Sequence, residues 1–114
     1  MTVRSYVPAT LDRLRRLVDE GRLASDVERF EPEGEDEESE YAALMAAADA
    51  AAALLGGPGR RVVVVAEVDA AEAPVTLRDV VAVHCDVADR PADADPDEDL
   101  AWFATQEIEQ LLAD

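Results

Sequence analysis

His84 and Cys85 come closest to a catalytic pair, because each is the only residue of its type in the chain. A thiol beside an imidazole is the arrangement of a nucleophile and its general base. Both residues lie in the run from Val80 to Cys85, which is typical of a strand, and neighbouring strand residues point to opposite faces. The two side chains therefore cannot pair. We expect Cys85 to be a small buried thiol on the face of Val83, and His84 to be structural.

The aspartates Asp93, Asp95 and Asp97 fall at alternate positions, as the first ligands of a calcium-binding EF-hand loop do. Such a loop also needs glycine at its sixth position and glutamate at its twelfth. Here these positions hold Glu98 and Ala104. The acids are better explained by the start of a helix, and the sequence predicts no metal site.

The glycine-rich segment from Gly56 to Gly59 is followed by Arg60 and Arg61, a composition that can bind phosphate. Phosphate-binding loops run from a strand into a helix, so that the amide groups at the helix N-terminus face the anion. Here a predicted helix precedes the loop and a predicted strand follows it. The glycines therefore indicate the end of a helix.

Other catalytic signatures are missing from the sequence. There is no G-x-S-x-G, H-E-x-x-H, C-x-x-C or G-x-G-x-x-G motif, and serine occurs only at positions 5, 25 and 39. Pairs of carboxylates are abundant, but nothing in their context distinguishes one pair from another. The sequence predicts no cofactor and favours a protein that is not an enzyme.

Residues 100–112, LAWFATQEIEQLL, predict an amphipathic helix. Asp95 would be its N-cap, Pro96 its first residue, and Glu98 would reach back as in a capping box. The helix places Trp102, the only tryptophan, opposite its apolar stripe and Glu107 inside that stripe. The stripe consists of Leu100, Phe103, Ala104, Ile108 and Leu111.

Two interpretations of this helix remain open. In the first, the acidic loop of the chain or Phe30 covers Trp102, and Glu107 lies at the edge of the stripe with its carboxylate solvated or paired with an arginine. In the second, the helix contacts a partner, either a second copy or another protein. Trp102 would then anchor the contact, with Thr105 and Gln106 as its polar rim.

A different class of function would need a pocket for a small molecule. The residues for such a site are Tyr6, the turn from His84 to Asp86, and Glu107, which would supply a carboxylate. The hypothesis of a small-molecule-binding protein or small enzyme at Tyr6, His84 and Glu107 is the alternative to an interaction or regulatory module.

The elements that would position these residues follow from local patterns. A strand is expected from Thr2 to Pro8, and Thr10 and Gly21 are expected to cap a helix between them. A second helix is expected over 37–55, followed by a buried strand over 60–68 and another over 80–85. The predicted buried face of the second helix consists of Tyr41, Leu44, Met45, Ala48, Ala52 and Leu55.

The fold class predicted from these elements is α/β. We expect a small mixed sheet of three to four strands, with the Val62–Val65 strand in its centre, packed with about three helices in two layers. An α+β arrangement is the alternative. The last two strands are either parallel or joined as a long hairpin. The 114 residues form a single predicted domain, with acidic loops at about 31–38 and 86–96.

The formal charge of −17 is concentrated after the first 30 residues, where 22 acids accompany four arginines. Such a field repels phosphate backbones and anionic lipids, so neither nucleic acid nor a membrane is an expected partner. The N-terminus shows no signal peptide, and the apolar segment 41–57 is too short and too alanine-rich to span a bilayer. We therefore expect a cytoplasmic protein.

Three segments together resemble an actinobacterial family of small proteins that is known only as a domain of unknown function. They are VRSYVPATLDRL, EDEESEYAALMAAADAAAALLGGPGRRVVVVAEV and LAWFATQEIEQLL, and their most specific parts are residues 40–44 and 102–107. Cys85 departs from the family pattern, which argues against an essential thiol. The resemblance covers almost the whole chain and implies a lineage, but no activity.

Overall fold

The computed structural model describes residues 2–23 and 27–113 of the chain, which are built around a four-stranded antiparallel sheet. The strands lie in the order of the sequence, each paired with the next. Their bounds are β1 (Val3–Ala9), β2 (Val62–Val68), β3 (Val80–Cys85) and β4 (Ala101–Ala104).

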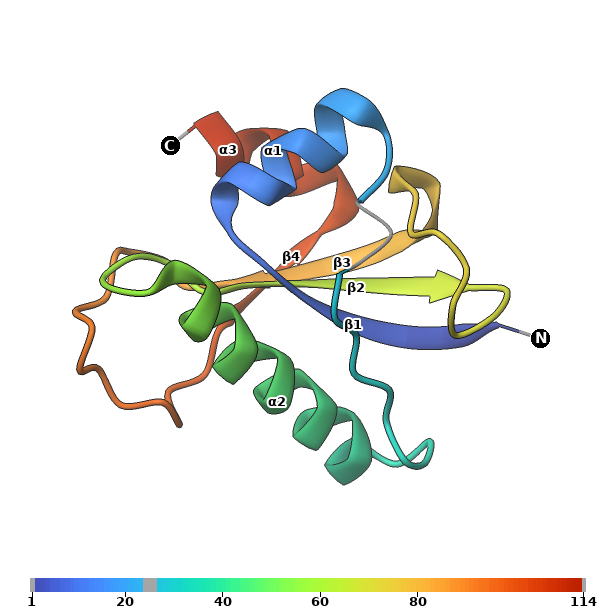
Figure 1. Ribbon diagram of the computed structural model, residues 1–114, viewed down its shortest axis with the longest axis horizontal. Helices are drawn as coiled ribbons and strands as arrows, with labels where there is room; N and C mark the ends of the chain where they lie inside the picture. The colour runs from blue at the N-terminus through green and yellow to red at the C-terminus, as the bar shows by residue number, and fades with distance from the viewer. Residues whose placement is uncertain (1, 24–26, 114) are drawn as a thin grey trace.

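Three α-helices pack on this sheet: α1 (Leu11–Glu20), α2 (Glu37–Leu55) and α3 (Ile108–Ala113). The predicted class, a small sheet with about three helices, is confirmed. Two details differ from the prediction. The sheet is antiparallel throughout rather than mixed, and the helices lie on both faces, α1 and α3 on one and α2 on the other, so there are three layers instead of two (Figure 1).

The strand over Val62–Val65 is central, as predicted, because both of its faces are covered. Val62 and Val64 belong to the core under α1 and α3, whereas Val63 and Val65 belong to the core under α2. Each of the four valines exposes 3% of its surface or less. A continuous valine run is the composition expected of a strand that is buried on both sides.

The connection between β2 and β3 decides the question that the sequence left open. The two strands pair antiparallel, with Val62 opposite Cys85 and Val65 opposite Ala82. The turn of 3₁₀ helix at Leu77–Asp79 lies within this connection. The long hairpin is therefore correct, and the parallel arrangement is wrong.

Helix α1 begins and ends where its capping residues predict. The Thr10 side chain accepts a hydrogen bond from the Arg13 amide at 3.2 Å, and Gly21 closes the helix with a φ of 80°. A left-handed residue at this place satisfies a free carbonyl of the last turn, and glycine adopts it without strain. The helix packs on the sheet through Leu14 and Leu17, both fully buried.

Helix α2 has the predicted bounds but a different buried face. The residues that it buries are alanines, of which Ala48 alone belongs to the predicted face. Leu44 packs at the margin of this core, and Tyr41 is 50% exposed. Methyl side chains let a helix approach a sheet closely, and this closeness leaves no room for leucine or tyrosine beneath it. The buried residues are Ala43, Ala47, Ala48 and Ala51.

The segments between these elements carry much of the negative charge. The first acidic segment ends at Asp36, which caps α2 by accepting a hydrogen bond from the Ser39 amide at 3.2 Å. The last two residues of the predicted loop at 31–38 thus belong to α2. The second acidic segment fills most of the interval between β3 and β4. Among the described residues, no helix is long and apolar enough to cross a membrane.

Candidate functional site

The C-terminal segment is not the single helix that its apolar pattern predicts. Residues 101–104 form the edge strand β4, residues 105–107 form a turn of 3₁₀ helix, and only α3 is α-helical. The predicted N-cap also differs, because the Asp95 carboxylate accepts a hydrogen bond from the Asp97 amide at 2.9 Å within an irregular loop. Pairing with β3 overrides the helical periodicity, and tryptophan and phenylalanine suit a strand.

Strand geometry gives Trp102 and Phe103 opposite surroundings. Phe103 packs against the core under α1 and α3, and Leu100 packs against the core under α2. By alternation, Trp102 shares the α2 side of the sheet with Leu100. Trp102 nevertheless exposes 60% of its surface, so neither the acidic loop nor Phe30 covers it. Phe30 instead pairs with Tyr6, at the opposite edge of the sheet.

The backbone of Trp102 points away from the sheet. The amide of Asp86 donates to the carbonyl of Arg61 at 3.2 Å, which fixes the alternation of bonded and non-bonded pairs along β3. By this alternation, the backbone N–H and C=O groups of His84 point towards β2, and those of Cys85 point towards β4. Trp102, which stands opposite His84, therefore belongs to a non-bonded pair, and its own N–H and C=O face the outer edge.

Thr105 and Gln106, the two residues predicted to surround Trp102, differ in whether their side chains are free to contact a partner. Thr105 uses its hydroxyl within the chain, donating to the Val80 carbonyl at 3.1 Å. Gln106 is exposed. Glu107 is exposed as well, not enclosed in an apolar stripe, and its carboxylate accepts a hydrogen bond from the Ala104 amide at 2.9 Å. Of the two predicted rim residues, Gln106 alone points to solvent.

The three residues of the alternative pocket lie apart. Tyr6 belongs to β1 and is buried under α2 with 5% exposure, and burial raises the pKa of its phenol. His84 belongs to β3, on the far side of β2. Glu107 lies in the turn after β4. The structure brings His84 beside Trp102, but it does not gather Tyr6, His84 and Glu107 around one cavity.

Cys85 and His84 point to opposite faces of β3, as the strand pattern predicts. Cys85 is fully buried in the core under α1 and α3, whereas His84 pairs with Val63, which belongs to the other core. Burial raises the pKa of the Cys85 thiol to about 11. The thiol contacts the Asp86 carbonyl at 3.3 Å. A buried thiol with so high a pKa is a poor nucleophile.

Sequence analysis missed a buried ion pair between Arg61 and Asp86, which expose 1% and 6% of their surfaces. The guanidinium donates from Nε and from an Nη to the two carboxylate oxygens, both at 2.9 Å, and the Arg61 amide donates to the same carboxylate at 2.8 Å. This hydrogen bonding raises the pKa of Arg61. Burial alone would raise the pKa of Asp86, but the Arg61 contacts and the Arg90 charge outweigh it, and the pKa is lowered.

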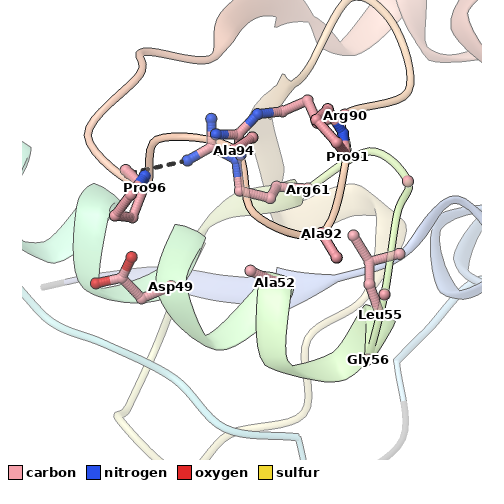
Figure 2. A pocket seen from close by; sticks show the side chains of 12 residues that line it. Asp49, Ala52, Leu55, Gly56, Arg61, Arg90, Pro91, Ala92, Ala94 and Pro96 are labelled. Atoms are coloured by element: carbon pink, nitrogen blue, oxygen red, sulfur yellow. Dashed lines mark hydrogen bonds between the residues drawn. The ribbon is translucent and has the colours of Figure 1, made fainter.

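Arg61 also holds the second acidic segment against the fold. Its guanidinium donates to the carbonyl of Pro96 at 3.2 Å (Figure 2) and to that of Glu98 at 2.9 Å. Arg90 adds a backbone bridge to Gly59, with N···O distances of 2.9 and 3.0 Å. The signal for this pair lay in position, because Arg61 directly precedes a buried strand and Asp86 directly follows its antiparallel neighbour.

A cleft of about 490 Å³ lies beside this pair, between the C-terminal end of α2 and the second acidic segment. Arg61 and Arg90 contribute to its wall together with Asp49, as Figure 2 shows. Arg61 already donates hydrogen bonds to the Asp86 carboxylate and to two backbone carbonyls, so few of its N–H groups remain to bind an anion. Within the described ranges, no group of three or more His, Cys, Asp and Glu side chains is arranged to hold a metal ion.

The fold and the exposed β4 edge define a small protein with a four-stranded antiparallel sheet, helices on both faces and an exposed tryptophan on an edge strand. Residues 3–112 match the family of unknown function DUF6912, and the chain belongs to this family. The resemblance seen in the sequence is thereby confirmed as membership of a family of unknown function. No curated protein and no solved structure matches the chain.

Proposed function

We propose that this protein is a cytoplasmic protein-interaction module that contacts its partner through the sheet edge at β4. The observation that carries the proposal is the exposure of Trp102, which leaves 60% of its surface in solvent on an edge strand. Tryptophan is enriched among the residues that dominate binding energy at interfaces.

The surroundings of Trp102 support a contact surface rather than an isolated exposed ring. Tyr41 of α2 is half exposed and donates a hydrogen bond to Asp99 at 2.8 Å, which ties the helix to the segment that leads into β4. Leu100 follows on the same side of the sheet as Trp102, and His84 stands opposite Trp102. We name Tyr41, His84, Leu100 and Trp102 the Trp102 surface.

The Trp102 surface has the composition of an interface core with a polar rim. Its members are aromatic or aliphatic apart from one imidazole, and Gln106 lies in solvent nearby along the chain. The partner can be a second copy, giving a homodimer, or another protein. In both cases the C-terminal segment remains the proposed contact surface, with the strand β4 in the place of the expected helix.

A cross-linking experiment in living cells tests this proposal. A photo-cross-linking amino acid at the exposed position Gln106 should yield a discrete protein adduct, and the Trp102→Ala substitution should remove it. The same amino acid at Glu20, exposed at the end of α1, is the control and should yield no such adduct. Equal adducts at both positions, or an adduct that persists without Trp102, would refute the proposed surface.

A further inference from the structure

The two edges of the sheet differ in what their backbones can still bind. At β1, the Tyr6 amide donates to the Phe30 carbonyl at 2.8 Å and the Phe30 amide donates back at 2.9 Å, so the chain itself covers the middle of this edge. At β4, the outward amide of Ala104 is taken by the Glu107 carboxylate. Among the described residues, no backbone group bonds to the outward N–H and C=O of Trp102.

An edge strand with free backbone groups is a template for an added strand. The outward groups of Trp102 lie beside its exposed ring, so an extended chain along β4 would gain backbone hydrogen bonds and bury the indole together. A cleft of about 590 Å³ adjoins the start of β4, with Val87, Leu100 and Ala101 among its lining residues. This cleft provides space for a side chain of the added strand.

The charge around β4 determines which kind of added strand can bind there. Asp97, Glu98 and Asp99 precede β4, and Glu107 and Glu109 follow it. All five are exposed, and the cleft at the start of β4 is also lined by the exposed Asp89. The nearby cations Arg60, Arg61 and Arg90 lie largely buried beside acidic partners of their own, Arg60 beside Asp89. An incoming strand therefore meets apolar surface between two acidic ends.

A second copy suits this edge poorly. In a two-fold antiparallel pairing of β4 with itself, the acids that precede the strand in one copy would meet those that follow it in the other. Like charges opposite each other destabilise a sheet, and each chain carries a formal charge of −17. The complementary occupant is a chain with basic residues at the positions that face the two acidic ends.

We propose that β4 accepts an extended, lysine- or arginine-bearing segment of another protein as a fifth strand, with an apolar residue of that segment against Trp102. This inference rests on the proposed interaction function and names the class of partner. Backbone pairing supplies the geometry, the indole supplies apolar burial, and the acidic ends supply selectivity for a basic sequence over an acidic one.

Synthetic peptides and the whole protein test this inference by NMR. The probe is a seven-residue peptide that alternates lysine and valine, and we expect it to shift the amides of residues 100–106 in a saturable way. An acidic peptide that alternates glutamate and valine should bind at least tenfold more weakly. A lysine–valine peptide with N-methylated backbone amides keeps the charge but loses strand pairing, and it should also bind at least tenfold more weakly.

Matched substitutions locate the contact on the protein. Trp102→Ala should weaken binding at least tenfold, whereas Leu54→Ala, which trims another exposed apolar side chain on α2, should leave it unchanged. The pair Asp99→Asn and Glu109→Gln should weaken binding more than the pair Glu33→Gln and Glu35→Gln. The second pair removes the same charge from the loop before α2.

The outcomes separate this inference from the proposed function. Equal binding of the N-methylated peptide would overturn strand addition, and equal binding of the acidic peptide would overturn the choice of a basic partner. Self-association that buries Trp102, seen in analytical ultracentrifugation and tryptophan emission, would overturn the inference yet leave the interaction surface standing. Absence of both peptide binding and the Gln106 adduct would overturn both proposals.

Discussion

His84 and Trp102 face each other across the β3–β4 ladder as a non-bonded pair, the kind of pair that holds its two side chains closest together. His84 is half-buried there, and this burial lowers its pKa below the ordinary histidine value of about 6.5, because the imidazolium ion is desolvated. The only histidine and the only tryptophan of the chain are thus neighbours, so the fluorescence of Trp102 can be used to follow the protonation of His84.

The first prediction is that tryptophan emission titrates with His84. A charged imidazolium beside the indole alters its emission, so the fluorescence of the folded protein should change with a midpoint below pH 6.5. The His84→Gln variant is the control and should lose this transition. A midpoint at or above 6.5 in the folded protein would contradict the burial of the imidazole.

The lowered pKa of His84 also makes the stability of the fold depend on pH, with lower stability in acid. Because the unfolded chain binds a proton to histidine at a higher pH than the folded chain does, acid favours unfolding. The free energy of unfolding should therefore fall as the pH drops below about 6.5, and His84→Gln should flatten this slope. Urea titrations between pH 5 and 8 measure it. An unchanged slope in the variant would show that other groups cause the effect.

The second prediction concerns the buried pair of Arg61 and Asp86. Asp86→Asn leaves the guanidinium buried without its counter-charge, which typically costs about 3–5 kcal/mol of unfolding free energy. Asp89→Asn is the control, because the Asp89 side chain is 82% exposed and lies 3.8 Å from the Arg60 guanidinium. A surface pair of this kind contributes about 1 kcal/mol or less. Urea denaturation of both variants should show the contrast.

The lowered pKa of Asp86 also predicts acid sensitivity. A carboxylate whose folded pKa lies below its unfolded value stabilises the fold at any pH above the unfolded value, and this contribution is lost as the pH falls through the folded pKa. Wild-type protein should thus lose this stability only below about pH 4, where Asp86 takes up its proton. The Asp86→Asn variant should show a shallower loss over that acidic range.

The third prediction is that the Cys85 thiol is inert in the folded protein. Its side chain is fully buried and its pKa is raised to about 11, so almost no thiolate is present at pH 8. A disulfide reagent such as dithiobis-nitrobenzoate should not react with native protein within minutes, but should react at once in urea. Rapid reaction of the native protein would mean that the core around Cys85 opens readily.

Local sequence patterns were sufficient to predict those elements that are determined by one or a few neighbouring residues. Thr10 and Gly21 fixed the ends of α1, and the glycines after Leu55 fixed the end of α2. The run Val62–Val65 placed β2 in the centre of the sheet. Each of these signals acts within a few residues of the chain, so no knowledge of the fold was needed to interpret it.

Local patterns predicted the wrong structure for the C-terminal segment, because its structure depends on residues that are distant in the sequence. Its apolar spacing suits a helix, yet pairing with β3 turns residues 101–104 into a strand, and only Ile108 and Leu111 keep their predicted burial in α3. The pair of Arg61 and Asp86 was missed for the same reason, since 25 residues separate its members. The exposure of Trp102 was one of two interpretations that the sequence left open, and it was assigned to a helix rather than to a strand.

The buried face of α2 shows a further limit of sequence patterns. Of the six residues that periodicity marked as buried, Ala48 alone is fully covered, and the other buried residues of the helix are alanines that the pattern did not mark. The fourth prediction follows: Ala47→Leu, at a position with no exposed surface, should cost about 1–3 kcal/mol because the helix cannot approach the sheet around a larger side chain. Ala53→Leu, on the exposed side, is the control and should change stability by about 0.5 kcal/mol or less.

The fifth prediction distinguishes the strand β4 from a helix by its alternation. Phe103 packs into the core under α1 and α3, so Phe103→Ala should cost about 2–3 kcal/mol, somewhat less than for a fully buried phenylalanine. Trp102→Ala should cost about 0.5 kcal/mol or less, because most of the indole lies in solvent. Equal costs in thermal or urea unfolding would contradict the opposite orientation of the two rings. Because Trp102→Ala should leave the fold intact, loss of an adduct in that variant can be assigned to the contact surface itself.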